Sequence, residues 1–241
     1  MTLKTSSHIF ETIDLTWPAE EFLEVPKWKL RKSIKGGKRV SAATTIGECC
    51  VSDIQFVENT LAEWRQDKLF MIKAGEKSLD EALKKRGYYI VDPTNIWSIS
   101  SKALAVLKVP PVTTFSIFPP LAIQRELWVA NGIDTSRIEI MDRVKTPKTT
   151  IFGRINAKPA ASAFVAVSNK IAMVHALIVD HKFQRQGMGK HVMQKVGVWA
   201  HQQGAESVVV LCTKQNQSAN NFYKILGMKV IGEYHYRLFK T

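Results

Sequence analysis

Apolar positions in the second half of the chain form an ordered series of segments typical of strands and helices. Runs rich in Val, Ile, Phe and Ala predict strands, whereas apolar positions spaced by about 3.6 residues predict helices. The length and apolarity of the run at 170–180 favour a central strand of a sheet. In chain order, the series comprises a helix at 121–132, strands at 149–156, 161–169 and 170–180, a helix at 188–203, a strand at 206–213, a helix at 218–226 and a strand at 228–240.

The first half also mixes helices and strands, and it carries no recognisable active-site motif. Apolar spacing over 54–64 predicts a helix with Ser52 as its cap, and a second helix is predicted between a Ser78 cap and Gly87. Strands are predicted on either side of a Gly36–Gly37 turn, at 69–75 and at 88–92.

A proline-rich stretch separates the two halves. Residues 106–120 hold four of the nine prolines and no acidic residue, which is typical of an extended connection between folded units. We therefore predict two domains, 1–115 and 116–241.

Composition indicates a globular protein with a substantial core, because 45% of the 241 residues are hydrophobic. No run approaches the ~18 to 20 apolar residues of a membrane span. The first residues include acids where a signal peptide has a basic end and an apolar run, so a cytoplasmic location is expected. The three cysteines form neither a disulfide framework nor a CxxC pattern, and no metal site is predicted.

The net charge of +13 is concentrated in the second half, where residues 121–241 hold 17 Lys and Arg against 7 Asp and Glu. A basic field attracts any polyanion, so charge admits both a nucleic acid and a phosphorylated cofactor. The basic segment 27–39 fits a nucleic-acid patch, but exposed Lys and Arg on an edge strand, where they block edge pairing, is the favoured interpretation.

The central strand runs into a glycine-rich turn that opens a helix, with Gln184, Gly187 and Gly189 in a Gln-x-x-Gly-x-Gly pattern. A helix N-terminus leaves backbone N–H groups without internal partners and carries partial positive charge, which suits an anion. Glycines let a phosphate approach these donors, and Arg185 and Lys190 add mobile charge. A tight strand-to-helix turn alone would need such glycines, so the motif gains meaning from its context.

A second motif follows about 30 residues later, where Asn216, Ala219, Phe222, Tyr223 and Gly227 lie on a helix and its terminator. The order of strand, glycine turn, helix, strand and Asn-x-x-Ala-x-x-Phe-Tyr helix resembles the GCN5-related N-acetyltransferase (GNAT) family. The match is close over 145–241, and residues 116–145 would supply the first helices of the family. It implies an α/β (α+β) fold with a mixed, mostly antiparallel sheet flanked by helices, in which two central strands splay apart to admit acetyl-CoA.

The resemblance also implies roles for individual residues. Tyr223 would protonate the departing thiolate as general acid, because a phenol can supply a proton while staying neutral at pH 7. Leu177, Ile178 and Val179 would pair their backbone with the pantetheine amides, and Asn216 and Ala219 would complete the cofactor site. The pyrophosphate would be bound, mainly through backbone N–H groups, by Gln184, Arg185, Gln186, Gly187, Met188, Gly189 and Lys190.

The base that accepts the proton of the amine is not evident. Some family members carry a Glu on the central strand, and by register that position is Met173 here. His175 lies two residues later on the same face and is the catalytic candidate, although a histidine on an apolar strand is more often a hydrogen-bonded core residue. Asp180 and His181 at the mouth of the site, and His235 on the last strand, are weaker candidates.

The first half more faintly resembles the degenerate half of two-domain GNAT proteins, because it repeats part of the element order without a glycine turn. It would wall the acceptor site rather than bind CoA. The predicted function is an N-acetyltransferase acting on a primary amine of a small molecule or protein. An acyl-CoA sensor without turnover and, on charge alone, a nucleic-acid-binding protein are the alternatives. No membrane partner is predicted, and homodimerisation is left open.

Overall fold

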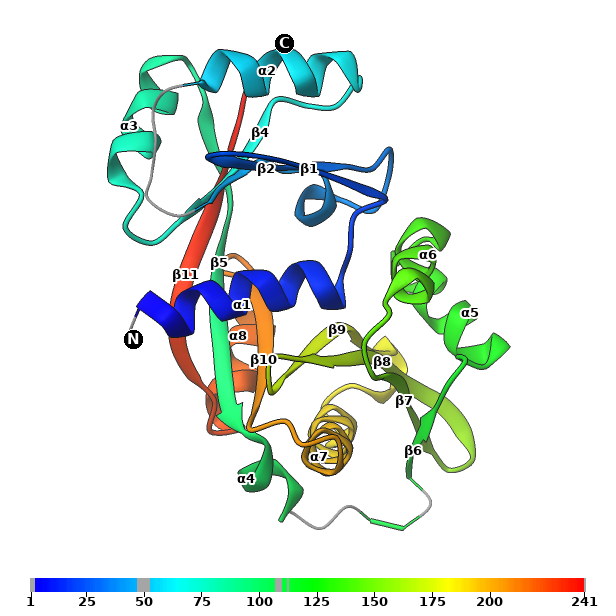
Figure 1. The fold of residues 1–241 in the computed structure, drawn as a ribbon. Helices are drawn as coiled ribbons and strands as arrows, with labels where there is room; N and C mark the ends of the chain where they lie inside the picture. The colour runs from blue at the N-terminus through cyan, green and yellow to red at the C-terminus, as the bar shows by residue number, and fades with distance from the viewer. Residues whose placement is uncertain (1–2, 47–52, 107–109, 112, 241) are drawn as a thin grey trace.

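The computed structural model describes residues 3–46, 53–106, 110–111 and 113–240 (Figure 1). Eight strands form one sheet in the order β4-β11-β5-β10-β9-β8-β7-β6. All neighbours in it are antiparallel except β9 and β10, which confirms the predicted mixed, mostly antiparallel architecture. The strands are β4 (Leu69–Lys73), β5 (Tyr89–Ser100), β6 (Thr114–Ile117), β7 (Lys148–Ile155), β8 (Lys158–Ser168), β9 (Ile171–Val179), β10 (Ser207–Thr213) and β11 (Lys229–Leu238).

A smaller sheet and helices on both faces complete the fold. The helices include α7, which packs with α4 and α8 on one face, and α1 and α5, which pack on the other. In the described part of the chain, no helix has the length and apolarity to cross a bilayer. The smaller sheet is β1 (Glu21–Val25), β2 (Trp28–Lys32) and β3 (Thr44–Thr45). The α-helices are α1 (Leu3–Thr16), α2 (Ile54–Glu63), α3 (Lys77–Lys85), α4 (Ser101–Ala105), α5 (Ala122–Ala130), α6 (Thr135–Arg143), α7 (Met188–Gln202) and α8 (Gln217–Ile225), and the 3-10 turns are η1 (Lys38–Val40) and η2 (His181–Phe183).

The two parallel strands separate along their length. Pairing between β9 and β10 extends only as far as Val174 opposite Val210, although β9 continues to Val179 and β10 to Thr213. A bulge contributes, because the register with β8 shifts near Ala176, which has a positive φ of 51°. An open slot between the carboxyl ends of two central strands follows, as the resemblance predicted.

The strands of the two predicted domains interleave in one sheet. Strand β5 lies between β11 and β10, and β11 lies between β4 and β5 (Figure 1). The same 140-residue interval separates the start of α3 from that of α8 (77 and 217) and the start of β5 from that of β11 (89 and 229). Each half therefore inserts one long strand between strands of the other.

The pairing register shows that this exchange is two-fold symmetric. Within the β5–β11 ladder, Tyr89 lies opposite Leu238 and Ser98 lies opposite Lys229, so each end of one strand meets the other end of its counterpart. The strands also share one burial pattern over their first ten residues. The assignment of 1–115 and 116–241 to separate domains stays a prediction, but each segment completes the sheet of the other.

One polar side chain fastens each exchanged strand. On α8, Asn220 Oδ1 accepts hydrogen bonds from Asn95 Nδ2 and Trp97 Nε1 of β5, each at 3.0 Å. At the position that matches Asn220 in the first half, Asp80 Oδ1 on α3 accepts from His235 Nε2 at 2.8 Å and Arg237 Nε at 2.7 Å. Each helix thus binds the strand that the other half contributes.

Several local predictions were wrong. The proline-rich connection contains β6, a short edge strand whose Thr-Phe-Ser-Ile alternation fits pairing with β7 between flanking prolines. The residue before α3 is Glu76 rather than Ser78, which lies inside the helix. Strand β5 continues past Pro93, and α1 and α4 were not anticipated. Ser52 lies outside the described residues.

We predict that Asp80→Ala destabilises the protein by about 2–4 kcal/mol at pH 7, because Arg237 is buried and would lose its carboxylate partner. Glu81→Gln on the exposed face of the same helix should cost less than about 0.5 kcal/mol. Chemical denaturation measures both. Equal effects of the two variants would contradict the proposed fastening role.

The effect of the carboxylate should also depend on pH. Burial opposes ionisation of Asp80, but hydrogen bonds from Arg237 and His235 outweigh it, and its pKa lies below the usual value of 3.8. The carboxylate therefore stabilises the fold fully above pH about 4 and loses this effect as the pH falls through the lowered folded-state pKa. The stability gap between wild type and Asp80→Asn should close in that range.

Candidate active site

The glycine turn between β9 and α7 is exposed and holds a left-handed backbone. Gly187 precedes α7 with φ 82°, and Arg185 has φ 62°. The side chains of Gln184, Arg185 and Lys190 are exposed, whereas Met188 turns into the core. The turn thus presents its backbone and its basic side chains to solvent.

The first turn of α7 offers free donors. Among the described residues, no protein acceptor lies within hydrogen-bond reach of the N–H groups of Met188, Gly189 and Lys190, and no side chain caps the helix. A Cβ built on Gly187 would meet only the ring of His191, at 3.9 Å, so the approach is open. A Cβ on Gly189 would lie 3.3 Å from Phe222, so this glycine lets α7 and α8 pack closely. These donors suit a phosphate group.

The slot between β9 and β10 begins beside this helix end. Leu177, Ile178 and Val179 are half-buried in a strand whose earlier residues are buried, and their edge toward β10 has no strand partner. The carbonyl of Ala176 accepts a hydrogen bond from Trp128 Nε1 at 2.9 Å, which fixes the bulge against α5. Backbone amide groups along an open edge of this kind can pair with an extended amide-containing ligand.

Helix α8 begins directly after β10, the other strand of the slot. Asn216 caps it by accepting a hydrogen bond from the N–H of Ala219 at 3.0 Å. Tyr223 is buried, with its ring 6.2 Å from that of Trp97. Burial raises the pKa of Tyr223 far above its usual value, and the neighbouring Cys212 contributes in the same direction. The phenol therefore remains a proton donor throughout the neutral range.

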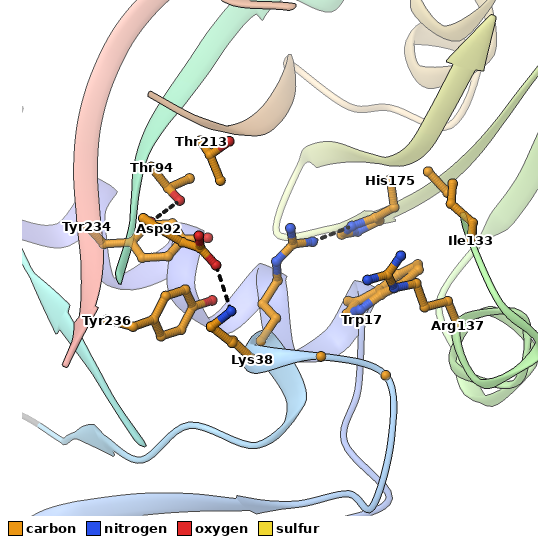
Figure 2. A pocket seen from close by; sticks show the side chains of 14 residues that line it. Trp17, Lys38, Asp92, Thr94, Ile133, Arg137, His175, Thr213, Tyr234 and Tyr236 are labelled. Carbon is orange, nitrogen blue, oxygen red and sulfur yellow. Dashed lines mark hydrogen bonds and ion pairs between the residues drawn. The ribbon is translucent and has the colours of Figure 1, made fainter. Parts of the chain in front are cut away.

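A cavity of about 330 Å³ opens at the diverging end of the two strands (Figure 2). It takes residues from both halves of the chain, because the exchanged strands and the loop before η1 lie against β9 and α6. The residues that line it are Trp17, Gly36, Gly37, Lys38, Arg39, Asp92, Thr94, Ile133, Arg137, His175, Ala176, Thr213, Tyr234 and Tyr236.

His175 lines this cavity, and both of its ring nitrogens have partners. The Nδ1 atom lies 3.3 Å from Arg39 Nη1, and Nε2 lies 3.0 Å from Thr16 Oγ1. An arginine only donates, so Nδ1 is the acceptor and Nε2 carries the proton, which it donates to Thr16. Burial, then the charge of Arg39, hold the pKa of His175 well below 6.5. This geometry favours a hydrogen-bonded core histidine over a free base, and the catalytic role stays a prediction.

The other candidates for a base lie elsewhere. Met173 is fully buried beneath α1. The carboxylate of Asp180 accepts a hydrogen bond from Lys182 N, which shapes the turn, with the exposed His181 beside it. His235 lies in a second cavity, where it binds Asp80. Asp92 is the one carboxylate among the residues that line the first cavity.

Sequence reasoning missed the residues that the first half brings to the cavity. Trp17, Lys38, Arg39 and Asp92 lie in no motif, and their neighbourhood depends on the exchange of strands. The positive φ of Asp92, 46°, where β11 has Gly232, had no signal in the sequence. Arg137 lies on α6, and no sequence pattern singled it out.

The matching slot in the first half is closed by side chains. The backbone of Ala43 pairs in parallel with Phe70, as β9 does with β10. Beyond this point, the buried carboxylate of Glu76 accepts hydrogen bonds from the Thr45 hydroxyl and from Lys73 N, and it therefore joins the two diverging strands. An extended ligand would have to displace these groups.

The comparisons with known proteins agree with this geometry. Residues 123–228 match the model of the acetyltransferase (GNAT) family. The chain is 23% identical over 236 residues to YobR of Bacillus subtilis, described as an uncharacterized N-acetyltransferase, with 92% of this chain and 94% of YobR covered.

Solved structures show the same fold over nearly the whole chain. A GCN5-related N-acetyltransferase from Kribbella flavida has a TM-score of 0.74 and 15% identity, with 99% of this chain and 95% of that chain covered. A tandem GNAT protein from the clavulanic acid biosynthesis pathway has a TM-score of 0.64 and 9% identity, with 96% and 87% covered. The predicted resemblance is confirmed over 123–228, whereas the degenerate character of the first half stays a prediction.

We predict that, because of His175, the protein becomes less stable as the pH decreases below about 6.5. The unfolded chain protonates this histidine near pH 6.5, but the folded state does not because its pKa is lowered. Stability should therefore fall by up to about 1.4 kcal/mol per pH unit until the folded-state pKa is reached. Denaturation of His175→Gln between pH 7 and pH 5 should lack this component. His201→Gln, which changes an exposed histidine, should retain it, and an unchanged slope in His175→Gln would contradict the assignment.

Proposed function

Since residues 123–228 form an acetyltransferase domain of the GNAT family, we propose that the protein transfers an acetyl group from acetyl-CoA to a primary amine of a small molecule. The observation that carries the proposal is the combination of an uncapped helix start and an open slot between β9 and β10. The slot leads to the cavity that both halves line.

The residues around the slot fit the chemistry of coenzyme A. The free N–H groups at the start of α7, with Arg185 and Lys190 beside them, would bind the pyrophosphate. The open edge at Leu177–Val179 would pair with the pantetheine amides, and Asn216 and Ala219 would border this arm from α8. When bound, acetyl-CoA supplies an activated thioester.

Tyr223 is the proposed proton donor. Its hydroxyl remains protonated because burial raises its pKa. The side chain belongs to α8, whose first turn borders the slot, so it can supply a proton or hydrogen bond to the departing sulfur. For His175, the two occupied ring nitrogens support a positioning role toward Arg39.

The cavity supports a small acceptor. Its volume of about 330 Å³ lies at the low end of the range of ligand pockets, ~300 to 1,000 Å³. Residues of the first half, including Trp17 and residues 36–39, line part of this small cavity. A cytoplasmic location remains a prediction from the sequence, and homodimerisation stays open.

A sensor that binds acyl-CoA without turnover is the second candidate. It is favoured by the buried Met173 at the position where some family members have a carboxylate. Both candidates require cofactor binding: at 100 times its dissociation constant, acetyl-CoA should stabilise the protein by about 2.7 kcal/mol. Release of free thiol in the presence of amines separates the enzyme from the sensor. The absence of any thermal shift would contradict both.

We predict that Gly187→Asp weakens CoA binding at least tenfold more than Gly187→Asn does. Both side chains tolerate the left-handed backbone at this position, and both would point into open space, so the pair differs mainly in charge. A carboxylate beside the pyrophosphate repels it, and tenfold corresponds to about 1.4 kcal/mol. Calorimetry with CoA measures both affinities. Equal affinities of the two variants would contradict the binding of the pyrophosphate at this turn.

We predict that Tyr223→Phe lowers kcat at least tenfold while CoA affinity changes less than about threefold. The substitution removes only the hydroxyl, and the ring keeps its packing against Trp97 and Phe222. Steady-state kinetics with acetyl-CoA, together with calorimetry, provide the two numbers. An unchanged kcat would reassign Tyr223 to packing.

A further inference from the structure

The cavity beside the slot carries more positive than negative charge. Lys38, Arg39 and Arg137 line it, against the single carboxylate of Asp92. Lys38 Nζ lies 2.9 Å from Asp92 Oδ2, so these two form an ion pair of their own. The guanidinium groups of Arg39 and Arg137 are not part of this ion pair.

Arg39 faces a neutral partner. Its Nη1 atom donates to His175 Nδ1, and His175 is held neutral by burial. Within the part of the chain that the structure describes, Arg39 forms no ion pair. A guanidinium has five N–H donors, and one hydrogen bond to an imidazole leaves most of them available to a ligand.

Arg137 reaches the same region from α6. Its Nη1 donates to the carbonyl of Gly132 at 3.0 Å, and its Nη2 would lie 3.9 Å from a Cβ built on Gly37, two residues before Arg39. The nearby carboxylate of Asp134 accepts hydrogen bonds from the Ser136 hydroxyl and the backbone N–H of Arg137. The Ser136 hydrogen bond and, more weakly, the charge of Arg137 lower the pKa of Asp134, but no hydrogen bond joins this carboxylate to the guanidinium in the described part of the chain. Arg137 also forms no ion pair within the described ranges.

Figure 2 shows how these groups are arranged. Lys38 and Asp92 lie on one side of the pocket, and Arg137, Trp17 and His175 lie on the other. His175 accepts the hydrogen bond from Arg39. The ring of Trp17 stacks on that of His175 at 4.7 Å, which gives this side a flat wall. Thr213, at the end of β10, also lines the pocket, next to the slot between β9 and β10.

We infer that the acceptor is an amine that also carries an oxyanion group, a carboxylate or a phosphate, and that Arg39 and Arg137 bind this group. Guanidinium forks bind such groups through two parallel charge-assisted hydrogen bonds, and a partly enclosed cavity strengthens them. The inference rests on the proposed function, because it names the substrate class of that same site.

Matched pairs of amines test this substrate class. Each pair compares an oxyanion-bearing amine with a similar amine that lacks the oxyanion. The pairs are an L-amino acid and its amide, 4-aminobutyrate and butylamine, and an aminoalkyl phosphate and the corresponding amino alcohol. We expect kcat/KM with acetyl-CoA to be at least tenfold higher for the anionic member of the preferred pair. The carboxylate and phosphate arms distinguish the two sources of the oxyanion.

Two arginine variants connect the preference to these residues. Arg39→Gln and Arg137→Gln should each raise KM for the preferred anionic amine at least tenfold, with less than a threefold change for its neutral partner. Arg137→Lys should recover part of the loss, because it keeps the charge without the fork. Arg125→Gln, on α5 and outside the cavity, is the matched control and should leave both values unchanged.

A binding measurement provides a readout that does not need turnover. Calorimetry of the preferred anionic amine with the protein saturated by CoA should give an affinity that falls at least tenfold in either variant. Neutral amines that react as well as their anionic partners, anionic amines that neither react nor bind, or variants that affect both members equally would overturn the inference. Failure to bind acetyl-CoA would instead contradict the proposed function.

Discussion

The antiparallel pairing of β5 with β11 is the interaction on which the rest of the structure depends. It joins the two halves of the chain through a two-fold symmetric ladder, and it places each long strand between strands of the other half. Asn220 and Asp80, at matching positions on α8 and α3, each bind the exchanged strand through two hydrogen bonds. Neither half contains a complete sheet without the other, so we expect the two to unfold as one cooperative unit.

The symmetry of the framework makes the differences between the halves informative. In the second half, β9 and β10 diverge into an open slot, whereas in the first half the carboxylate of Glu76 joins the diverging strands. The same architecture thus holds one open site and one closed site. The first half contributes to the cavity beside the open slot, because residues 36–39 and its exchanged strand β5 form part of the cavity wall.

The charges of this cavity follow from the same arrangement. Among the residues that line it, Asp92 lies on the exchanged strand β5, Arg39 lies on η1, and Arg137 lies on α6 of the other half. Arg39 is oriented by His175, a buried histidine whose second nitrogen is held by Thr16 on α1. These contacts support a positioning role of His175 toward Arg39, whereas its catalytic role stays a prediction.

The sequence by itself determined α5, the strands and helices from β7 to β11, the glycine turn and the family resemblance of residues 123–228. These features are local: the glycines, the apolar runs and the spacing on α8 act over a few residues of neighbouring chain. It did not determine β6, α1 or α4, whose short or weakly patterned segments take their form from packing. Only the tertiary structure decided the strand exchange, the closed slot at Glu76 and the meeting of Arg39, Asp92 and Arg137. Each of these depends on contacts between segments far apart in the sequence or on which side chain fills a gap, and neither has a local signal.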